Sequence, residues 1–298
     1  MTMLENFFSL NGSTKHFGKK EELIEYQNKH DTIRNYVYEP DELKGVKFKH
    51  KTFNNVSFSK TLIEDVEFLN CHFIDCLFVG TEIKKCKFVD VSFLGCNTYR
   101  IRIYESYINP SSFNENFKGL SYSYSNIIVH LYQELYNNSV DQQIIEFSKK
   151  AKYNLLKWEG RLLISKYRYK QPYKIPFCQF FYEYALNILY GKVFGYGLRL
   201  RNFIVTFSIV YITSFITNYL LWDEYKLKSK DITLNSFESG DYSFFANFYY
   251  TNDALTKIVD SQIQPSSDCG MISLTIQSIL GFVLFSFLIT ILINKFVK

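Results

Sequence analysis

The chain has 298 residues and a formal net charge of +5 at pH 7, a length that fits about two domains. Its Lys and Arg residues form no continuous basic stripe, so the composition argues against a protein that binds nucleic acid. No apolar stretch follows Met1, so no cleavable secretory signal is expected. Five of the six cysteines precede residue 200, and this part of the chain is expected to stay in the cytoplasm, where thiols remain reduced.

The N-terminal third contains a five-residue repeat, which follows an N-terminal cap or irregular region over residues 1–45. From Phe48 to Phe93 a large apolar residue recurs at every fifth position, nearly always two positions after a small or β-branched residue. A period of five fits neither a helix nor a strand. It predicts a chain that turns a corner every five residues, with two side chains inward and three outward. Columns of Phe and Ile recur every 20 residues, which predicts four-sided coils stacked at the spacing of hydrogen-bonded strands.

These units resemble the pentapeptide-repeat family over Val46–Phe113, with Phe at the centre and Val, Cys or Thr where the family usually has Ala. The resemblance implies a right-handed quadrilateral β-helix over residues 46–113, to which a protein partner could bind. Some members of the family mimic DNA through an acidic surface. This segment has nine Lys or Arg and seven Asp or Glu, a net charge of +2, which argues against a DNA mimic. Its cysteines follow the repeat and not a zinc-ligand pattern, so neither a metal nor a cofactor is expected.

Residues 114–174 are interpreted as a helical cap and linker. Apolar residues recur at helical spacing in 127–137 and 141–169, which predicts helices that cover the open end of the solenoid. Residues 175–202 combine many aromatic residues with flanking cations, a pattern typical of an amphipathic helix at the membrane interface. Packing of this helix against the solenoid remains open as an alternative.

The C-terminal part, residues 203–298, is predicted to cross a membrane twice. Phe203–Trp222 and Ile272–Asn294 contain no charged residue, and each is long enough to cross a hydrocarbon core of about 30 Å. Two spans place both termini on one side, and the cytoplasmic location expected for the N-terminal part makes that side the cytoplasm. Inorganic cations and the lipid bilayer are therefore candidate partners.

The second predicted span carries a line of polar residues, here called the hydroxyl stripe. Such a face either lines water or packs against another helix, and both interpretations remain open. Phe282 lies in the gap of the stripe, and Gly281 beside it is a hinge candidate. The residues of the stripe, which are the pore-lining candidates together with Phe282, are Thr275, Ser278, Ser286, Thr290 and Asn294.

Residues 241–297 resemble the pore loop and second helix of two-helix potassium-type channels, in the form that occurs fused to pentapeptide repeats in bacteria. The stretch GYGLRLRNF (195–203) resembles the segment before the first helix of those fusions, and PSSDCGMISLTIQSILGFVLFSFL (265–288) resembles the start of their second helix. The resemblance implies a re-entrant loop at about 241–265, a homotetramer and a location in the bacterial inner membrane.

The resemblance fails at the selectivity filter, where the family has TTLGYGD. The residues at these positions are Thr256, Lys257, Ile258, Val259, Asp260, Ser261 and Gln262. Val259 and Ser261 stand at the two filter glycines, whose backbone angles other residues reach only at a cost. We therefore expect a poorly selective or regulated pore, in which a ring of Asp260 carboxylates could attract cations and Lys257 would oppose them. The alternative, that Asp260 faces the outer solution as an ordinary loop carboxylate, remains open.

Two further interpretations compete with the pore. The chain could be a membrane-anchored scaffold or binding module with a non-conducting channel remnant. An enzyme is not expected, because the sequence contains no catalytic triad, metal cluster or Gly-rich phosphate loop. A membrane-permeabilising role in stress or phage defence would suit a pore, although no residue points to it.

Overall fold

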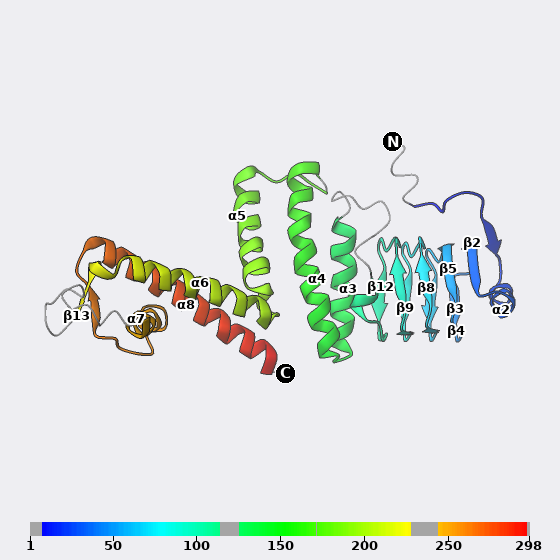
Figure 1. Cartoon of the computed structure of the whole chain (residues 1–298). Coiled ribbons are helices and arrows are strands. Elements are labelled where there is room, and N and C mark those ends of the chain that lie inside the picture. The colour runs from blue at the N-terminus through cyan, green and yellow to red at the C-terminus, as the bar shows by residue number, and fades with distance from the viewer. Residues whose placement is uncertain (1–7, 114–124, 171, 228–243, 297–298) are drawn as a thin grey trace. The chain divides into compact units, whose positions relative to one another are not determined.

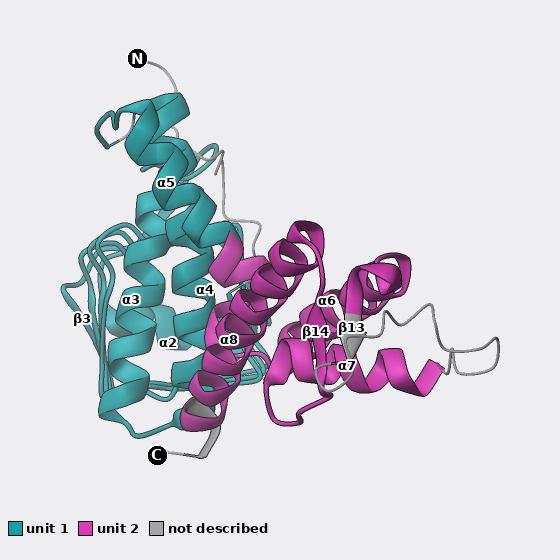
Figure 2. Cartoon of the chain, turned by 90° about the vertical axis from the view of Figure 1, so that its left-hand side faces the viewer, with its two compact units in different colours: residues 1–188 teal, residues 189–298 magenta. Residues whose placement is uncertain are grey.

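The structure is a computed structural model of the chain, and it describes residues 8–113, 125–170, 172–227 and 244–296 (Figure 1). The chain divides into two compact units, residues 1–188 and 189–298, which are described separately (Figure 2). Residues 241–243 of the expected re-entrant loop, and 1–7 and 114–124 of the expected N-terminal region and linker, lie outside the described residues.

The first unit begins with short strands that pair in parallel. They are β1 (Lys15–Phe17), β2 (Thr32–Tyr38), β3 (Glu42–Lys44), β4 (Lys47–Lys49), β5 (Thr52–Ser57), β6 (Leu62–Glu64), β7 (Glu67–Leu69), β8 (His72–Ile74), β9 (Glu82–Lys84), β10 (Lys87–Val89), β11 (Ser92–Leu94) and β12 (Arg102–Tyr104). Their sheets have the orders β1-β2-β5-β8-β11, β10-β7-β4 and β12-β9-β6-β3. A further line of parallel bridges joins Ser57, Leu77 and Asn97. This arrangement is a solenoid-like stack of parallel strands.

The predicted coil length is confirmed by the strand register. Phe53 pairs with Phe73, and Phe73 pairs with Phe93. Their rings stack nearly parallel, with centroids 4.8 and 4.9 Å apart. This distance equals the usual spacing of hydrogen-bonded strands, so the ring ladder and the backbone ladder advance together. All three rings are buried, which makes the Phe column the centre of the core.

The corners of the coils explain the polar residues of the repeat. At these positions the backbone adopts the left-handed conformation, which Gly, Asn and Asp reach most readily. This preference accounts for the Asn, Asp and Gly residues at many corners. The corner residues with positive φ are Asn35, Gly45, His50, Asn55, Lys60, Asp65, Asn70, Asp75, Gly80, Lys85, Asp90, Gly95, Arg100 and Glu105.

The parallel stack begins earlier than the expected boundary at Val46. In β2, Ile33 pairs with Phe53, and in β3, Leu43 pairs with Ile63. Ile33 and Leu43 continue the five-residue rhythm backward from Phe48, but Asp31 and Asp41 stand where later units have small residues. Residues 1–45 are therefore not all cap or irregular chain. Helix α2 (Lys20–Lys29) precedes β2, and its Leu23 is part of the solenoid core.

Helices follow the last coil, as the spacing of apolar residues predicts. They are α3 (Ser125–Asp141), α4 (Ile145–Ile164) with a π-helical turn over Ser165–Tyr169, and α5 (Phe177–Ile188). Apolar side chains of α3 join the same core as the Phe column. The Asn138 amide pairs with the backbone of Ser106, accepting from its N–H at 2.9 Å and donating to its carbonyl at 2.7 Å. These bonds replace the strand that the last coil lacks, and α3 lies beside β12 in Figure 1.

The second unit contains two long apolar helices and a shorter one. After a π-helical segment (Leu189–Val193) and a 3₁₀ turn (Gly195–Gly197) come α6 (Leu200–Leu220), a 3₁₀ turn (Trp222–Glu224), β13 (Tyr225–Leu227), α7 (Phe244–Thr256), β14 (Ile263–Pro265) and α8 (Asp268–Phe296). The interfacial helix expected over 175–202 is not continuous, because Gly195, Tyr196 and Gly197 take positive φ values and end it. Helix α6 and residues 268–293 of α8 are long and apolar enough to cross a membrane, and little of either is buried.

Candidate functional site

A buried polar cluster joins helices α6, α7 and α8 of the second unit. Asn218 of α6 donates to the Thr251 hydroxyl of α7 at 3.0 Å and to the Gln277 side-chain oxygen of α8 at 3.0 Å. Gln277 in turn donates to the Asn218 side-chain oxygen at 2.7 Å. All three side chains are buried, so each hydrogen bond that is lost leaves a polar atom without water. The cluster therefore fixes α7 against both long helices.

The C-terminal end of α7 rests directly on α8 at Gly281. A Cβ atom at Gly281 would overlap the carbonyl oxygen of Leu255, so only glycine permits this approach. One turn earlier, the Ser278 hydroxyl donates to the Ala254 carbonyl oxygen at 3.3 Å. The hinge candidate is thus a contact point between two helices, and Ser278 of the hydroxyl stripe is engaged there.

The loop after α7 folds back onto the last turn of that helix. The buried Asp253 carboxylate accepts hydrogen bonds from the Ser261 backbone N–H at 3.1 Å and from its hydroxyl at 2.6 Å. The Lys257 ammonium lies 3.4 Å from the other oxygen of the same carboxylate. Asp253 was not predicted as a site residue, although its place four residues before Lys257 on a helix is a detectable ion-pair signal.

The backbone of this loop differs from that of a glycine filter. Positive φ values occur at Lys257 and Gln262, both 56°, and not at Val259 or Ser261, which stand at the filter-glycine positions. Asp260 is exposed, and its carboxylate accepts from the Gln262 backbone N–H at 3.1 Å and from the Gln262 amide at 2.6 Å. Of the other loop residues, Thr256 and Ile258 are exposed and Val259 is half-buried.

Most of the hydroxyl stripe lies on an uncovered face of α8. Thr275, Ser286 and Thr290 are exposed, and each donates to the carbonyl oxygen four residues earlier at 2.8, 2.9 and 3.0 Å respectively. Phe282 is 74% exposed on the same face, whereas the side chain of Asn294 lies outside the described residues. This face can meet water, lipid or a second copy of the chain.

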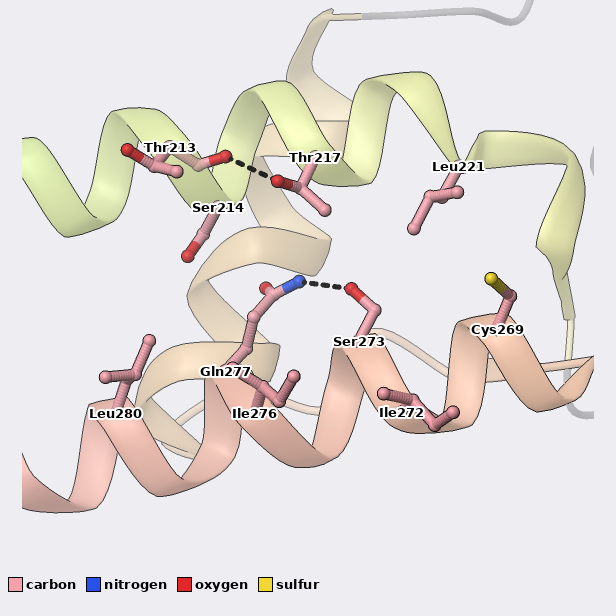
Figure 3. A pocket seen from close by; sticks show the side chains of 10 residues that line it. All are labelled: Thr213, Ser214, Thr217, Leu221, Cys269, Ile272, Ser273, Ile276, Gln277 and Leu280. Atoms are coloured by element: carbon pink, nitrogen blue, oxygen red, sulfur yellow. Dashed lines mark hydrogen bonds between the residues drawn. The ribbon is translucent and has the colours of Figure 1, made fainter.

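A cavity of about 370 Å³ lies between α6 and α8 (Figure 3). It is lined by Thr213, Ser214, Thr217, Leu221, Cys269, Ile272, Ser273, Ile276, Gln277 and Leu280. The Gln277 amide of the buried cluster reaches into this space and donates to the Ser273 hydroxyl at 3.0 Å. Among the described residues, no group of three or more His, Cys, Asp or Glu side chains is placed to hold a metal ion.

The first unit and the comparisons with known sequences agree on one identification. Parallel strands that pair from one coil to the next define the class, a solenoid-like repeat protein. Residues 46–118 match the family described as the pentapeptide repeat region, so the chain contains a pentapeptide repeat region. The match ends before α6 and α8, and therefore says nothing about the second unit. No curated protein matches the chain.

Proposed function

We propose that the chain forms an oligomeric ion pore in a membrane, with the second unit as the membrane domain. The single observation that carries this proposal is the attachment of α7 to both long helices through the Asn218 cluster. With 13 residues, α7 is about 20 Å long, too short to cross a hydrocarbon core of about 30 Å. If α6 and α8 span the bilayer, α7 enters it and its chain returns to the same side, as a pore loop does.

The pore lies on a symmetry axis between copies, because two long helices and one short one cannot enclose a path for ions. The resemblance to one-loop channels suggests four copies. The uncovered hydroxyls of Thr275, Ser286 and Thr290 suit the wall of that path, because they add polarity without unpaired donors.

Selectivity in this pore would depend on charge and not on a potassium filter. The φ angles at Val259 and Ser261 and the tie between Asp253 and Ser261 support a loop that does not present a row of carbonyl oxygens to ions. Exposed Asp260 is the candidate for attracting inorganic cations. We propose no catalytic role, metal or cofactor for the chain, and no binding to nucleic acid.

The solenoid would form the cytoplasmic domain, for assembly or sensing, and could bind a protein partner. The proposed arrangement is a right-handed quadrilateral β-helix, two spans with both termini in the cytoplasm, and a location in the bacterial inner membrane. A pore of this kind would suit a permeabilising effector in stress or phage defence.

The alternative function is a membrane-anchored scaffold with a non-conducting remnant of a channel. The observation that favours it is the closed loop, in which Asp253 holds both Lys257 and Ser261. A loop fixed in this way in every copy would close the path for ions along the symmetry axis.

Currents across planar bilayers containing the purified full-length protein test the proposal. We expect cation currents that do not distinguish potassium from sodium, reduced by Ser286→Trp and retained in the matched control Ile209→Trp on the exposed face of α6. A pore-facing Asp260 predicts that Asp260→Asn lowers the cation-to-anion permeability, with the effect shrinking at high salt. Intact oligomers without current would support the scaffold. Native mass spectrometry that finds only monomers would exclude the pore.

A further inference from the structure

Helix α5 packs against α4 with only one of its faces. On this inner face the Phe180 ring stacks on Tyr167 with centroids 4.4 Å apart, and the Asn187 amide donates to the Leu156 carbonyl oxygen at 3.2 Å. Gly160 of α4 permits this contact, because a Cβ there would overlap the Asn187 side chain. No residue of α5 is buried, so its remaining surface is uncovered.

The outer face of α5 is apolar and aromatic. Phe177, Phe181 and Tyr182 are 59%, 63% and 66% exposed, and Leu186 extends the same face. The one charged residue of the helix is half-buried Glu183, which accepts a hydrogen bond from the amide of exposed Gln179 at 2.8 Å. A contiguous group of large exposed rings on a helix is a site for contact with a partner or a membrane, because water alone would leave this area unfavourably hydrated.

The turn that leads into α5 is strongly basic. Between Ser165 and Lys174 the chain has four cations and no carboxylate. The Lys166 ammonium lies 4.7 Å from the centroid of the Tyr173 ring, and the Arg168 guanidinium lies 5.9 Å from that of Tyr169. The turn and the outer face of α5 are here called the α5 surface. It combines positive charge with amphipathic rings, as surfaces at a lipid headgroup layer do.

The covalent chain limits how far α5 can be from a bilayer. Eleven residues lie between Ile188 and Leu200, where α6 begins, and even fully extended they reach about 40 Å. If α6 spans a membrane, the C-terminal end of α5 therefore lies no farther than about 40 Å from the start of that span.

We infer that the α5 surface binds the anionic headgroup layer of the membrane that α6 spans. Aromatic residues of the outer face enter the boundary between headgroups and acyl chains, and the cations of the turn bind lipid phosphates. The inference rests on the proposed membrane insertion of α6, but not on ion conduction. It makes α5 a support that ties α4, and the core that α4 joins, to the membrane surface.

Depth-dependent fluorescence quenching in nanodiscs tests the inference on the full chain. In a background of Cys178→Ser and Cys269→Ser, a fluorophore on Phe181→Cys is compared with one on Ile209→Cys of α6. Discs contain phosphatidylcholine alone or mixed with phosphatidylglycerol, and spin-labelled lipids carry the quencher near the headgroup or deep in the chain. We expect quenching at 181 by the shallow label and at 209 by the deep label. A probe on Gln142→Cys, about 30 Å away along α4, is expected to stay unquenched.

The charge requirement is tested separately with Arg168→Gln and Lys174→Gln combined. This variant is expected to lose the part of the quenching at 181 that depends on anionic lipid. Quenching at 209 without quenching at 181 would overturn the inference while leaving the membrane span intact, and would mean that protein covers the α5 surface. No quenching at either position would overturn the proposed insertion itself. Equal quenching at 181 in both lipid mixtures would exclude a role for the cations.

Discussion

Replacement of Gln277 by leucine measures what the buried polar cluster contributes to the second unit. The substitution removes the two hydrogen bonds between the Gln277 and Asn218 amides, at 3.0 and 2.7 Å. Asn218 keeps Thr251 as an acceptor, but its own side-chain oxygen keeps only the Tyr225 hydroxyl, at 3.4 Å. Hydrogen bonds between membrane helices are worth about 0.6 kcal/mol on average and up to about 1.7. We therefore expect Gln277→Leu to lower the free energy of unfolding by about 1–3 kcal/mol.

The double variant that combines Gln277→Leu with Asn218→Leu tests whether the two amides stabilise the unit as a specific hydrogen-bonded pair. Once Asn218 is also leucine, no amide is left without its partner, so the double variant should be no less stable than the more affected single variant. The coupling free energy from this cycle should be about 1 kcal/mol or more. Unfolding of the full chain in mixed micelles can be followed by Trp222, which packs near Tyr225 in the same cluster of rings, in a Trp158→Phe background.

Thr275→Val is the matched control for this cycle, because the Thr275 hydroxyl bonds only to its own helix backbone. It should change the free energy of unfolding by less than about 0.5 kcal/mol. The reasoning would be refuted if the effects of the two leucine substitutions simply added, or if Gln277→Leu were as mild as this control.

Further predictions concern the solenoid and the topology of the chain. Phe73→Ala should lower the free energy of unfolding of the first unit by about 3–5 kcal/mol in denaturant titrations, because the ring is fully buried in the Phe column. Lys60→Gly should raise it by about 0.5–1 kcal/mol, because φ is 64° at this corner. In intact cells a membrane-impermeant maleimide should modify exposed Cys269, if residues 223–271 face outward. Burial raises the pKa of Cys86 to about 11, so this thiol should react slowly with a maleimide at neutral pH in the native protein. Its rate of reaction should rise about tenfold for each pH unit up to that pKa.

Three of these predictions have a control within the chain. Leu94→Ala, at an exposed position of the same column of strands, should cost far less than Phe73→Ala, and equal costs would contradict the coil register. Gly80→Ala, one coil after Lys60, should destabilise the protein, because its φ is 66°. Exposed Cys178 should react only after cells are permeabilised, and labelling of Cys178 but not Cys269 in intact cells would reverse the proposed orientation.

The coil register was predictable because each coil repeats the contacts of the one before it. Phe73 meets Phe53 and Phe93 through the same strand pairing, so one periodicity in the sequence fixes all these contacts. The first coils were missed because Asp31 and Asp41 occupy positions that are small elsewhere, while the apolar rhythm continues through Ile33.

The polar cluster could not be placed in the same way, since no period relates Asn218 to Gln277. The hydroxyls of α8 are the visible polar groups of its sequence, but a hydroxyl can bond to the carbonyl of its own helix, as Thr290 does to Ser286. A long amide side chain in an apolar helix cannot satisfy all its groups in this way and needs a partner on another helix. The amides of the predicted spans, Asn218 in the first and Gln277 and Asn294 in the second, were therefore the available signal, but the sequence does not give the depth or rotation at which two helices meet.

The stacking of coils of equal length has a consequence for the evolution of the solenoid. Because strands pair with their counterparts 20 residues further along the chain, a duplication of one 20-residue coil leaves the pairing at both ends unchanged. Each added coil lengthens the stack by about 4.8 Å, the strand spacing, without rotating the helices at its end relative to the last coil. A duplication of a single unit, in contrast, would move every later corner to the next side and place Ile columns on Phe columns. Relatives of this chain should therefore differ in solenoid length by whole coils, and insertions of other sizes should occur at the corners as outward loops.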